Sequence, residues 1–105
     1  MVKYIVYHSA KFDKELEKFD KDFLDWLNKI EGQLSENPYA GDPLDVEWLR
    51  EKKYKKFRVY FIVNDDLTTV FMVGISEKKD QQRVINTIRL LLEFFRSELE
   101  GLAKK

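Results

Sequence analysis

The fold of this chain is decided by residues 57–75, which read FRVYFIVNDDLTTVFMVGI. Apolar side chains recur at every second position of residues 57–64, and this is the period of a β-strand. One face of that strand carries Phe57, Val59, Phe61 and Val63, and the other carries Arg58, Tyr60 and Ile62. The Asn-Asp-Asp run at 64–66 is a tight-turn signal, and a second strand follows from Thr68 to Ile75. The stretch therefore predicts an antiparallel hairpin.

The residues before the hairpin predict one strand and two helices. Residues 2–8 are rich in Tyr, Ile and Val, and Ser9 is suited to cap a helix. As one rod, the helical pattern that follows would be about 39 Å long, so we expect a break near residues 19–22 and an antiparallel helical hairpin, with Asp20 capping its second helix. The helical stripe comprises Phe12, Leu16, Phe19, Phe23, Trp26 or Leu27, Ile30 and Leu34.

The rest of the chain completes an α+β pattern. Residues 37–43 hold both prolines and one of the four glycines, which predicts a loop. Residues 46–54 predict a strand, and about 79–102 a long helix. The order β-α-α-β-β-β-α predicts a single domain over residues 1–105, an antiparallel sheet with the helical hairpin packed on one face and a C-terminal helix, and we expect the helices on one side of the sheet.

The expected C-terminal helix is apolar almost all round near its middle, at Leu90, Leu91, Leu92, Phe94 and Phe95. A single core-facing stripe is narrower than this. Either the helix lies deep in its own domain, or a homodimer seam or a partner protein covers its second surface.

Composition excludes several classes of protein. Thirty-six per cent of the 105 residues are charged, above the roughly 25% of average proteins. Cysteine is absent and His8 is the one histidine, so we expect no disulfide, metal or cofactor. No apolar run is long enough to span a membrane and no signal peptide precedes the domain, which predicts a cytoplasmic protein with no membrane partner. Abundant Lys and Glu without Cys is also typical of hyperthermophile proteins.

Two sets of titratable residues are given a structural or surface role. His8 ends the first strand, and no Asp, Glu or second His can be placed to orient its ring. A solvated helix face explains the acidic residues Asp13, Glu15, Glu17, Asp20, Asp22 and Asp25.

The net charge of zero conceals a strongly uneven distribution. Residues 1–49 carry a net charge of −5, residues 50–58 carry +5, and residues 59–105 carry 0. A basic hairpin with interleaved Tyr54, Phe57 and Tyr60 suits RNA, because cations follow phosphates and aromatic faces stack on unpaired bases. The alternative is a solvated turn whose lysines keep an edge strand from aggregating. Arg58 lies opposite the apolar face of its strand, where we expect it to face solvent or a ligand.

The order of these elements resembles the RelE/ParE superfamily, the toxin half of toxin–antitoxin pairs. The resemblance covers roughly residues 3–90. Its pieces are a first strand leading into Ser9-Ala10-Lys11-Phe12, the helical hairpin, a loop over 34–44 close to L-x-x-N-P-x-x-G-x-x-L, a basic strand, Phe57-Arg58-Val59-Tyr60-Phe61 in place of Y-R-V-x-Y, and Val70 to Ile75 followed by Lys78-Lys79.

The resemblance implies a toxin of the RelE branch, neutralised by a cognate antitoxin. Such toxins cut messenger RNA at the ribosome: the 2′-hydroxyl attacks the adjacent phosphate, and Lys and Arg stabilise the transition state without a metal. Carried over by position, the catalytic candidates are Arg58, Lys52, Lys53 and Lys79. The RNA-binding candidates are Arg50, Tyr54, Lys55, Lys56, Tyr60, Lys78 and Arg83, with Tyr60 or Tyr54 replacing the family's C-terminal Tyr.

Two other functions fit the same pattern. One is a ParE-like gyrase inhibitor, which needs protein contacts and not RNA-cutting residues. The other is a catalytically degenerate member that acts as an interaction module and dimerises through the C-terminal helix.

Overall fold

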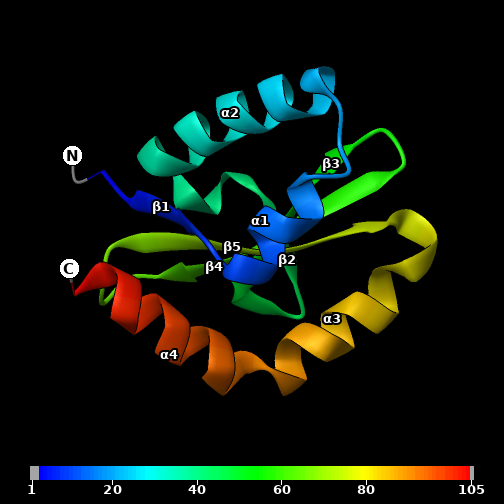
Figure 1. Cartoon of the computed structure of the whole chain (residues 1–105). Coiled ribbons are helices and arrows are strands. Elements are labelled where there is room, and N and C mark those ends of the chain that lie inside the picture. Colours follow the sequence, from blue (N-terminus) through cyan, green and yellow to red (C-terminus); the bar gives the residue numbers. More distant parts are fainter. Residues whose placement is uncertain (1–2, 105) are drawn as a thin grey trace.

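The computed structural model describes residues 3–104 and shows a five-stranded sheet between two pairs of helices (Figure 1). The strands lie in the order β1-β5-β4-β3-β2. The elements are β1 (Ile5–His8), α1 (Ala10–Leu16), α2 (Lys21–Glu36), the 3-10 turn η1 (Pro38–Ala40), β2 (Asp42–Leu44), β3 (Val46–Tyr54), β4 (Phe57–Asn64), β5 (Thr69–Glu77), the 3-10 turn η2 (Lys78–Asp80), α3 (Gln81–Leu90) and α4 (Leu92–Ala103).

The predicted caps and the break between the first two helices are confirmed. The Ser9 hydroxyl accepts a hydrogen bond from the Phe12 backbone N–H at 3.0 Å, and the Asp20 carboxylate accepts one from the Phe23 N–H at 3.0 Å. Each cap satisfies a backbone donor that has no partner inside its helix. Of the predicted first strand, Val2 lies outside the described residues.

The sheet is antiparallel from β2 to β5, but β1 pairs with β5 in parallel. The connection from β1 to β5 runs through α1 and α2 to β2 at the opposite edge of the sheet, and returns through β3 and β4. A short strand, β2, also forms inside the expected loop. The α+β class is therefore as predicted, and the sheet is mixed.

Helices cover both faces of the sheet, so the expectation that they lie on one side is wrong. Phe61 and Met72 pack with α1 and α2 in one core, whereas Tyr60, Phe71 and Val73 pack with α3 and α4 in a second core. The predicted final helix is broken at Leu91, where φ and ψ are −97° and 13°, and both halves bury residues against the sheet.

A bulge in β5 sets the faces of its last residues. Phe61 of β4 pairs with Met72 and Tyr60 pairs with Gly74, so Val73 is an extra residue. Beyond the bulge, Ile75 joins the core beneath α1, and the Ser76 hydroxyl lies next to that of Tyr60 on the opposite face. The bulge thereby turns a polar side chain of β5 toward α3.

Within residues 3–104, no helix is both long and apolar enough to cross a membrane.

Candidate nucleic-acid interface

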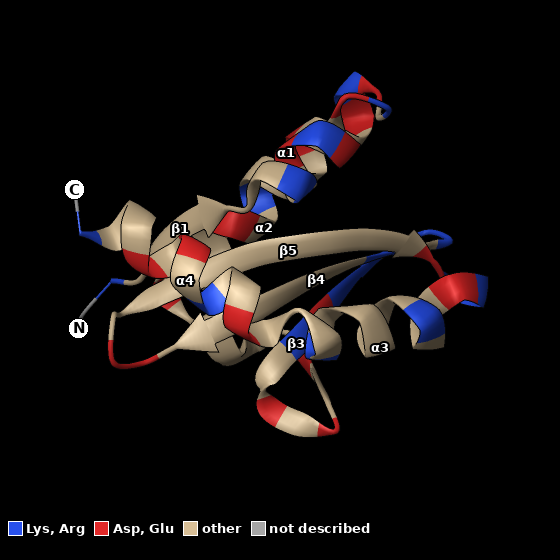
Figure 2. Ribbon diagram, turned by 60° about the horizontal axis from the view of Figure 1, so that its bottom comes forward, with Lys and Arg blue, Asp and Glu red and all other residues tan. Residues whose placement is uncertain are grey.

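The predicted basic residues meet at one end of the sheet, around the turn between β3 and β4. Figure 2 shows Lys and Arg segments at the far ends of β4 and β5 and at the start of α3. The backbone N–H of Lys78 donates to the Lys56 carbonyl at 2.8 Å, which joins η2 to this turn. Lys55, Lys56, Lys78 and Lys79 are therefore brought together from two distant segments.

Cross-strand pairing divides the two neighbouring catalytic candidates of β3. Lys53 pairs with Arg58, which pairs with Ser76, so these three share the face covered by α3. Lys52 instead pairs with Val59, whose side chain lies in the core beneath α1 and α2. Successive side chains of a strand point to opposite faces, so Lys52 and Lys53 are not placed in one site.

Arg58 is buried, with 8% of its surface exposed, which corrects the expectation of a solvent-facing side chain. Its Nη1 donates to the carbonyls of Lys55 and Phe57, at 3.1 and 2.9 Å. Within residues 3–104, Nε and Nη2 have no protein hydrogen bond. These bonds orient the guanidinium at the turn and leave two of its nitrogens for a ligand such as a phosphate.

Behind Arg58 lies a polar pair of side chains that the sequence reading missed. The hydroxyls of Tyr60 and Ser76 lie 2.7 Å apart, and Tyr60 is fully buried. Burial raises the pKa of Tyr60, the Ser76 bond lowers it, and the charges of Glu51 and Arg58 act in opposite directions. The predicted stacking of Tyr60 on a base does not fit this burial, because its ring lies in the core between the sheet and the C-terminal helices.

A second missed pair ties the wall of the site to the sheet. The Gln81 Nε2 donates to the Glu51 Oε1 at 2.5 Å, and Glu51 is buried. This bond joins the first residue of α3 to β3 and holds the start of α3 over the face that carries Arg58. Glu51 lies between Arg50 and Lys52 in the sequence, a setting typical of a solvated charge, so no local pattern predicts this role.

Ion pairs engage several of the basic residues around the β3–β4 turn and after β5. Glu77 lies 3.1 Å from Lys56 and 3.7 Å from Lys79, and its pKa is lowered first by the hydrogen bond from Lys56. Arg83 lies 3.6 Å from Asp80. Within residues 3–104, Lys55 and Lys78 have no carboxylate within 4 Å. The predicted residues here form a basic rim with compensating acids.

Tyr54 belongs to an aromatic cluster on the α2 side of the sheet. Its ring centroid lies 4.9 Å from that of Trp26 and 5.4 Å from that of Phe23. The ring is therefore packed against α2, away from the face that holds Arg58. Stacking of Tyr54 on a base at Arg58 does not fit this placement.

Arg50 acts as a clamp on the loop before β3. Its guanidinium donates to the carbonyls of Gly41, Glu47 and Tyr39 at 2.8–3.1 Å, and it lies 5.1 Å from the centre of the Tyr39 ring. A side chain at Gly41 would approach the Glu51 carbonyl to 2.7 Å, so the loop needs glycine there. These bonds give Arg50 a structural role, and we leave it out of the proposed site.

His8 has the partners that the sequence reading did not find. Its Nδ1 lies 2.6 Å from Asp13 and its Nε2 lies 2.5 Å from Glu31. The pKa of His8 is raised, chiefly by the hydrogen bond to Glu31 and less by that to Asp13, while burial lowers it. The imidazole joins β1, α1 and α2, and Asp13 is more than a solvated surface acid.

Across the described part of the chain, no group of three or more His, Asp or Glu side chains is arranged to hold a metal ion. The chemistry available around Arg58 is that of cations, hydroxyls and carboxylates.

Comparison with solved structures identifies a RelE-like toxin fold. A doubly substituted E. coli RelE toxin in the free state matches with a TM-score of 0.72 and 16% identity, covering 85% of this chain and 98% of that one. The RelBE2 toxin–antitoxin complex of Mycobacterium tuberculosis matches with a TM-score of 0.64 and 24% identity, covering 72% and 99%. The intact E. coli RelBE toxin–antitoxin complex matches with a TM-score of 0.63 and 19% identity, covering 70% and 95%. No protein-family model and no curated protein matches the chain.

Proposed function

We propose that this chain is a RelE-like toxin that cleaves messenger RNA at the ribosome as a metal-independent endoribonuclease. The observation that carries the proposal is Arg58, a buried arginine at the basic end of a RelE-like fold, with two nitrogens that have no hydrogen-bond partner within residues 3–104. A guanidinium held in this way is suited to bind a phosphate without reorganising during the reaction.

In the proposed reaction, the 2′-hydroxyl of a nucleotide attacks the adjacent phosphorus. The O2′–P bond forms and the P–O5′ bond breaks, and the proton of the 2′-hydroxyl passes to a base while the leaving oxygen gains one. Arg58 stabilises the negative charge that develops on the phosphate oxygens. Lys53 shares its face, and Lys79 lies on the neighbouring rim; we assign them to charge stabilisation and proton transfer. Lys52 has no part in this site.

The cations of the basic rim are proposed to bind the RNA strand. Lys55 and Lys78 have no carboxylate partner within residues 3–104, and Lys56 and Arg83 lie beside them or on the adjoining wall. We propose that these four side chains contact phosphates on either side of the cleaved bond. Contacts to phosphates carry no sequence information, so these side chains should position the RNA strand without selecting a sequence.

Arg58→Ala tests the proposal. In cells that express each protein, we expect wild type to stop growth and to leave messenger RNAs cut inside codons, and Arg58→Ala to lower cleavage by about 10²–10³-fold. Arg96→Ala is the matched control, because Arg96 lies on α4 and pairs with Glu93 at 3.4 Å. Unimpaired growth with folded wild-type protein would refute the toxin proposal. Loss of DNA supercoiling by gyrase, with messages intact, would favour the ParE-like alternative.

We also propose a cognate antitoxin as the protein partner. Two of the similar structures are toxin–antitoxin complexes, RelBE2 and RelBE. A small charged protein encoded by the neighbouring gene should co-purify with this chain and restore growth. Failure of every neighbouring gene product to do so would contradict the proposed pairing.

A further inference from the structure

The second half of β5 has no strand beside it on its outer edge. Within the described residues, β1 pairs only with Thr69 to Met72, so residues 73–77 form a free edge. Two cavities of about 350 and 150 Å³ lie along this edge, and they share Glu15, Ile75 and Ser76. Because they share these residues, the cavities adjoin along the edge, and we name the two together the β5-edge groove.

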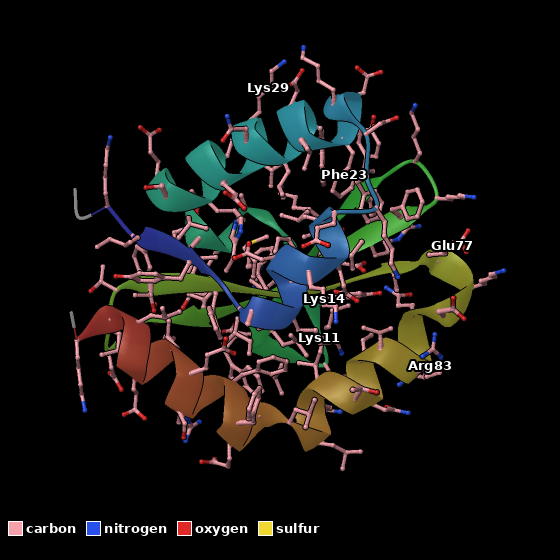
Figure 3. The ribbon with its side chains drawn as sticks, in the orientation of Figure 1. Lys11, Lys14, Phe23, Lys29, Glu77 and Arg83 are labelled. Atoms are coloured by element: carbon pink, nitrogen blue, oxygen red, sulfur yellow. The ribbon has the colours of Figure 1, made fainter. Side chains whose placement is uncertain are left out.

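The walls of the β5-edge groove come from α1 and α3. Lys11 and Arg83 line the larger cavity from opposite sides, and Lys18 lines the smaller one. In Figure 3, Lys11 and Lys14 lie on α1 and Arg83 on α3, while Lys29 lies on the far side of the molecule on α2. The α1 lysines belong to the acidic first half of the chain, yet the fold sets them beside the basic end of the sheet.

Two of the three acids that line the groove are paired with cations, and the third, Glu15, has no ion pair within residues 3–104. The lysines of the groove, Lys11 on α1 and Lys18 just after it, are not paired. Glu77 pairs with Lys56 and Lys79, and Asp80 pairs with Arg83. In contrast, within residues 3–104 neither Lys11 nor Lys18 has a carboxylate within 4 Å. These two cations are therefore free to meet an anionic ligand.

The smaller cavity adds aromatic surface. Phe19 and Phe57 line it and are only partly buried, with ring centroids 5.0 Å apart. The Lys56 Nζ lies 5.5 Å from the centre of the Phe57 ring. Cations beside partly exposed aromatic rings are the features with which proteins hold single-stranded RNA.

Glu15 argues against a peptide strand as the occupant. A peptide that extended the sheet would need the outward backbone N–H of Ile75, but this N–H faces the Glu15 carboxylate, whose pKa is raised by burial and lowered by this N–H, so the peptide would compete with Glu15 for the same donor. The other carboxylate oxygen, Oε1, is buried without a hydrogen-bond partner in the described residues. That oxygen can accept a hydrogen bond from a base amino group or a 2′-hydroxyl that enters the groove.

The groove also leads to the proposed cleavage site. Ser76 lines both cavities, bonds to Tyr60, and is the cross-strand neighbour of Arg58. We infer that the β5-edge groove carries the single-stranded RNA that flanks the cleaved bond, with Lys11 and Lys18 on its phosphates. The inference rests on the proposed function and extends its RNA contacts from the hairpin and α3 to α1.

The test is a binding measurement that does not require cleavage. The probe is a fluorescent single-stranded RNA of about twelve nucleotides, a length one binding groove can cover, with 2′-methoxy groups that remove the nucleophile. Fluorescence anisotropy at several salt concentrations gives the dissociation constant and its salt slope. Lys11→Ala/Lys18→Ala is compared with Lys29→Ala/Lys104→Ala, whose lysines are exposed and lie outside the groove.

We expect Lys11→Ala/Lys18→Ala to weaken binding about tenfold near physiological salt and to reduce the salt slope by about 1.4, since each phosphate contact on a single strand contributes about 0.7. The control pair removes the same charge and should leave the slope unchanged. Equal slopes for the two double variants, or no RNA binding by wild type, would overturn the inference. If slopes are equal but wild type still cuts messages and Arg58→Ala does not, the groove inference fails and the proposed function stands.

Discussion

Replacing His8 should destabilise the domain and remove a pH dependence that no other histidine can supply. The imidazole lies between Asp13 and Glu31, at 2.6 and 2.5 Å, and its ring packs edge-on against Phe12. Both partners are hydrogen-bond acceptors when ionised, so both bonds form only with the protonated ring. We therefore expect the folded state to hold a proton on His8 at neutral pH.

The sign of the pH effect follows from the raised pKa of His8. Its contribution is fully present below the unfolded value, about 6.5, and is lost as pH rises through the higher folded value. Glu31 is 19% exposed and its charged bond should contribute about 1.5–3 kcal/mol, whereas Asp13 is 62% exposed and its bond is screened to below about 1 kcal/mol. We expect His8→Gln to cost about 2–3 kcal/mol in total, or about 10 °C in Tm.

Urea unfolding from about pH 5.5 to about pH 9 measures this effect, and His8→Gln, which keeps one donor but no charge, is compared with wild type. The wild-type free energy of unfolding should fall toward the value of the variant as pH rises. Since His8 is the one histidine, its NMR signal gives the folded pKa directly. A folded pKa at or below about 6.5, or parallel pH profiles for the two proteins, would refute the reasoning.

Three further predictions concern the loop before β3, the turn between β4 and β5, and the C-terminal helices. Arg50→Ala removes the loop clamp and leaves buried carbonyls unpaired, so chemical unfolding should show a loss of about 2–4 kcal/mol. Asp65 accepts a hydrogen bond from Tyr39, whose pKa it raises to about 12, so Asp65→Asn should return the Tyr39 pKa toward 10 in an ultraviolet titration. Leu90 and Phe94 are 86% and 62% exposed, as expected of a surface that a second copy or a partner protein covers. If the cover is a second copy, light scattering should show a dimer that Phe94→Glu converts to a monomer, and a monomeric wild type would contradict the homodimer.

Local patterns predicted the elements well, because they depend on neighbouring residues. The alternation in β4, the cap at Ser9 and the break before Asp20 are all local properties, and each is confirmed. The parallel pairing of β1 with β5 is not local, since more than 60 residues separate Ile5 from its partner Thr69. No feature of either strand alone identifies that partner.

Coverage of both sheet faces did have a signal in the sequence. Residues 70–73 of β5 are a continuous apolar run, typical of a central strand with both faces covered. The alternating pattern of β4, taken alone, predicts that the face carrying Arg58 is open to solvent. Arg58 and Tyr60 share that side, so covering it with α3 and α4 buried both. One missed layer of helices thus explains two errors in the site.

The net charge of zero arises from acidic and basic residues that occupy separate regions, both along the chain and in the folded structure. Lys11 and Lys18 lie in the acidic first half of the chain, yet α1 packs on β5 and sets them beside the groove at the basic end. Two of the three acids there are engaged by neighbouring cations: Glu77 by Lys56 and Lys79, and Asp80 by Arg83. The third is Glu15, which lines both cavities. Association with RNA should therefore depend on a local field, which is screened beyond roughly 8 Å at physiological salt. A chain of this kind gains little long-range steering, so under the proposed function its affinity for RNA should come from short-range contacts at Arg58, on the basic rim and within the groove.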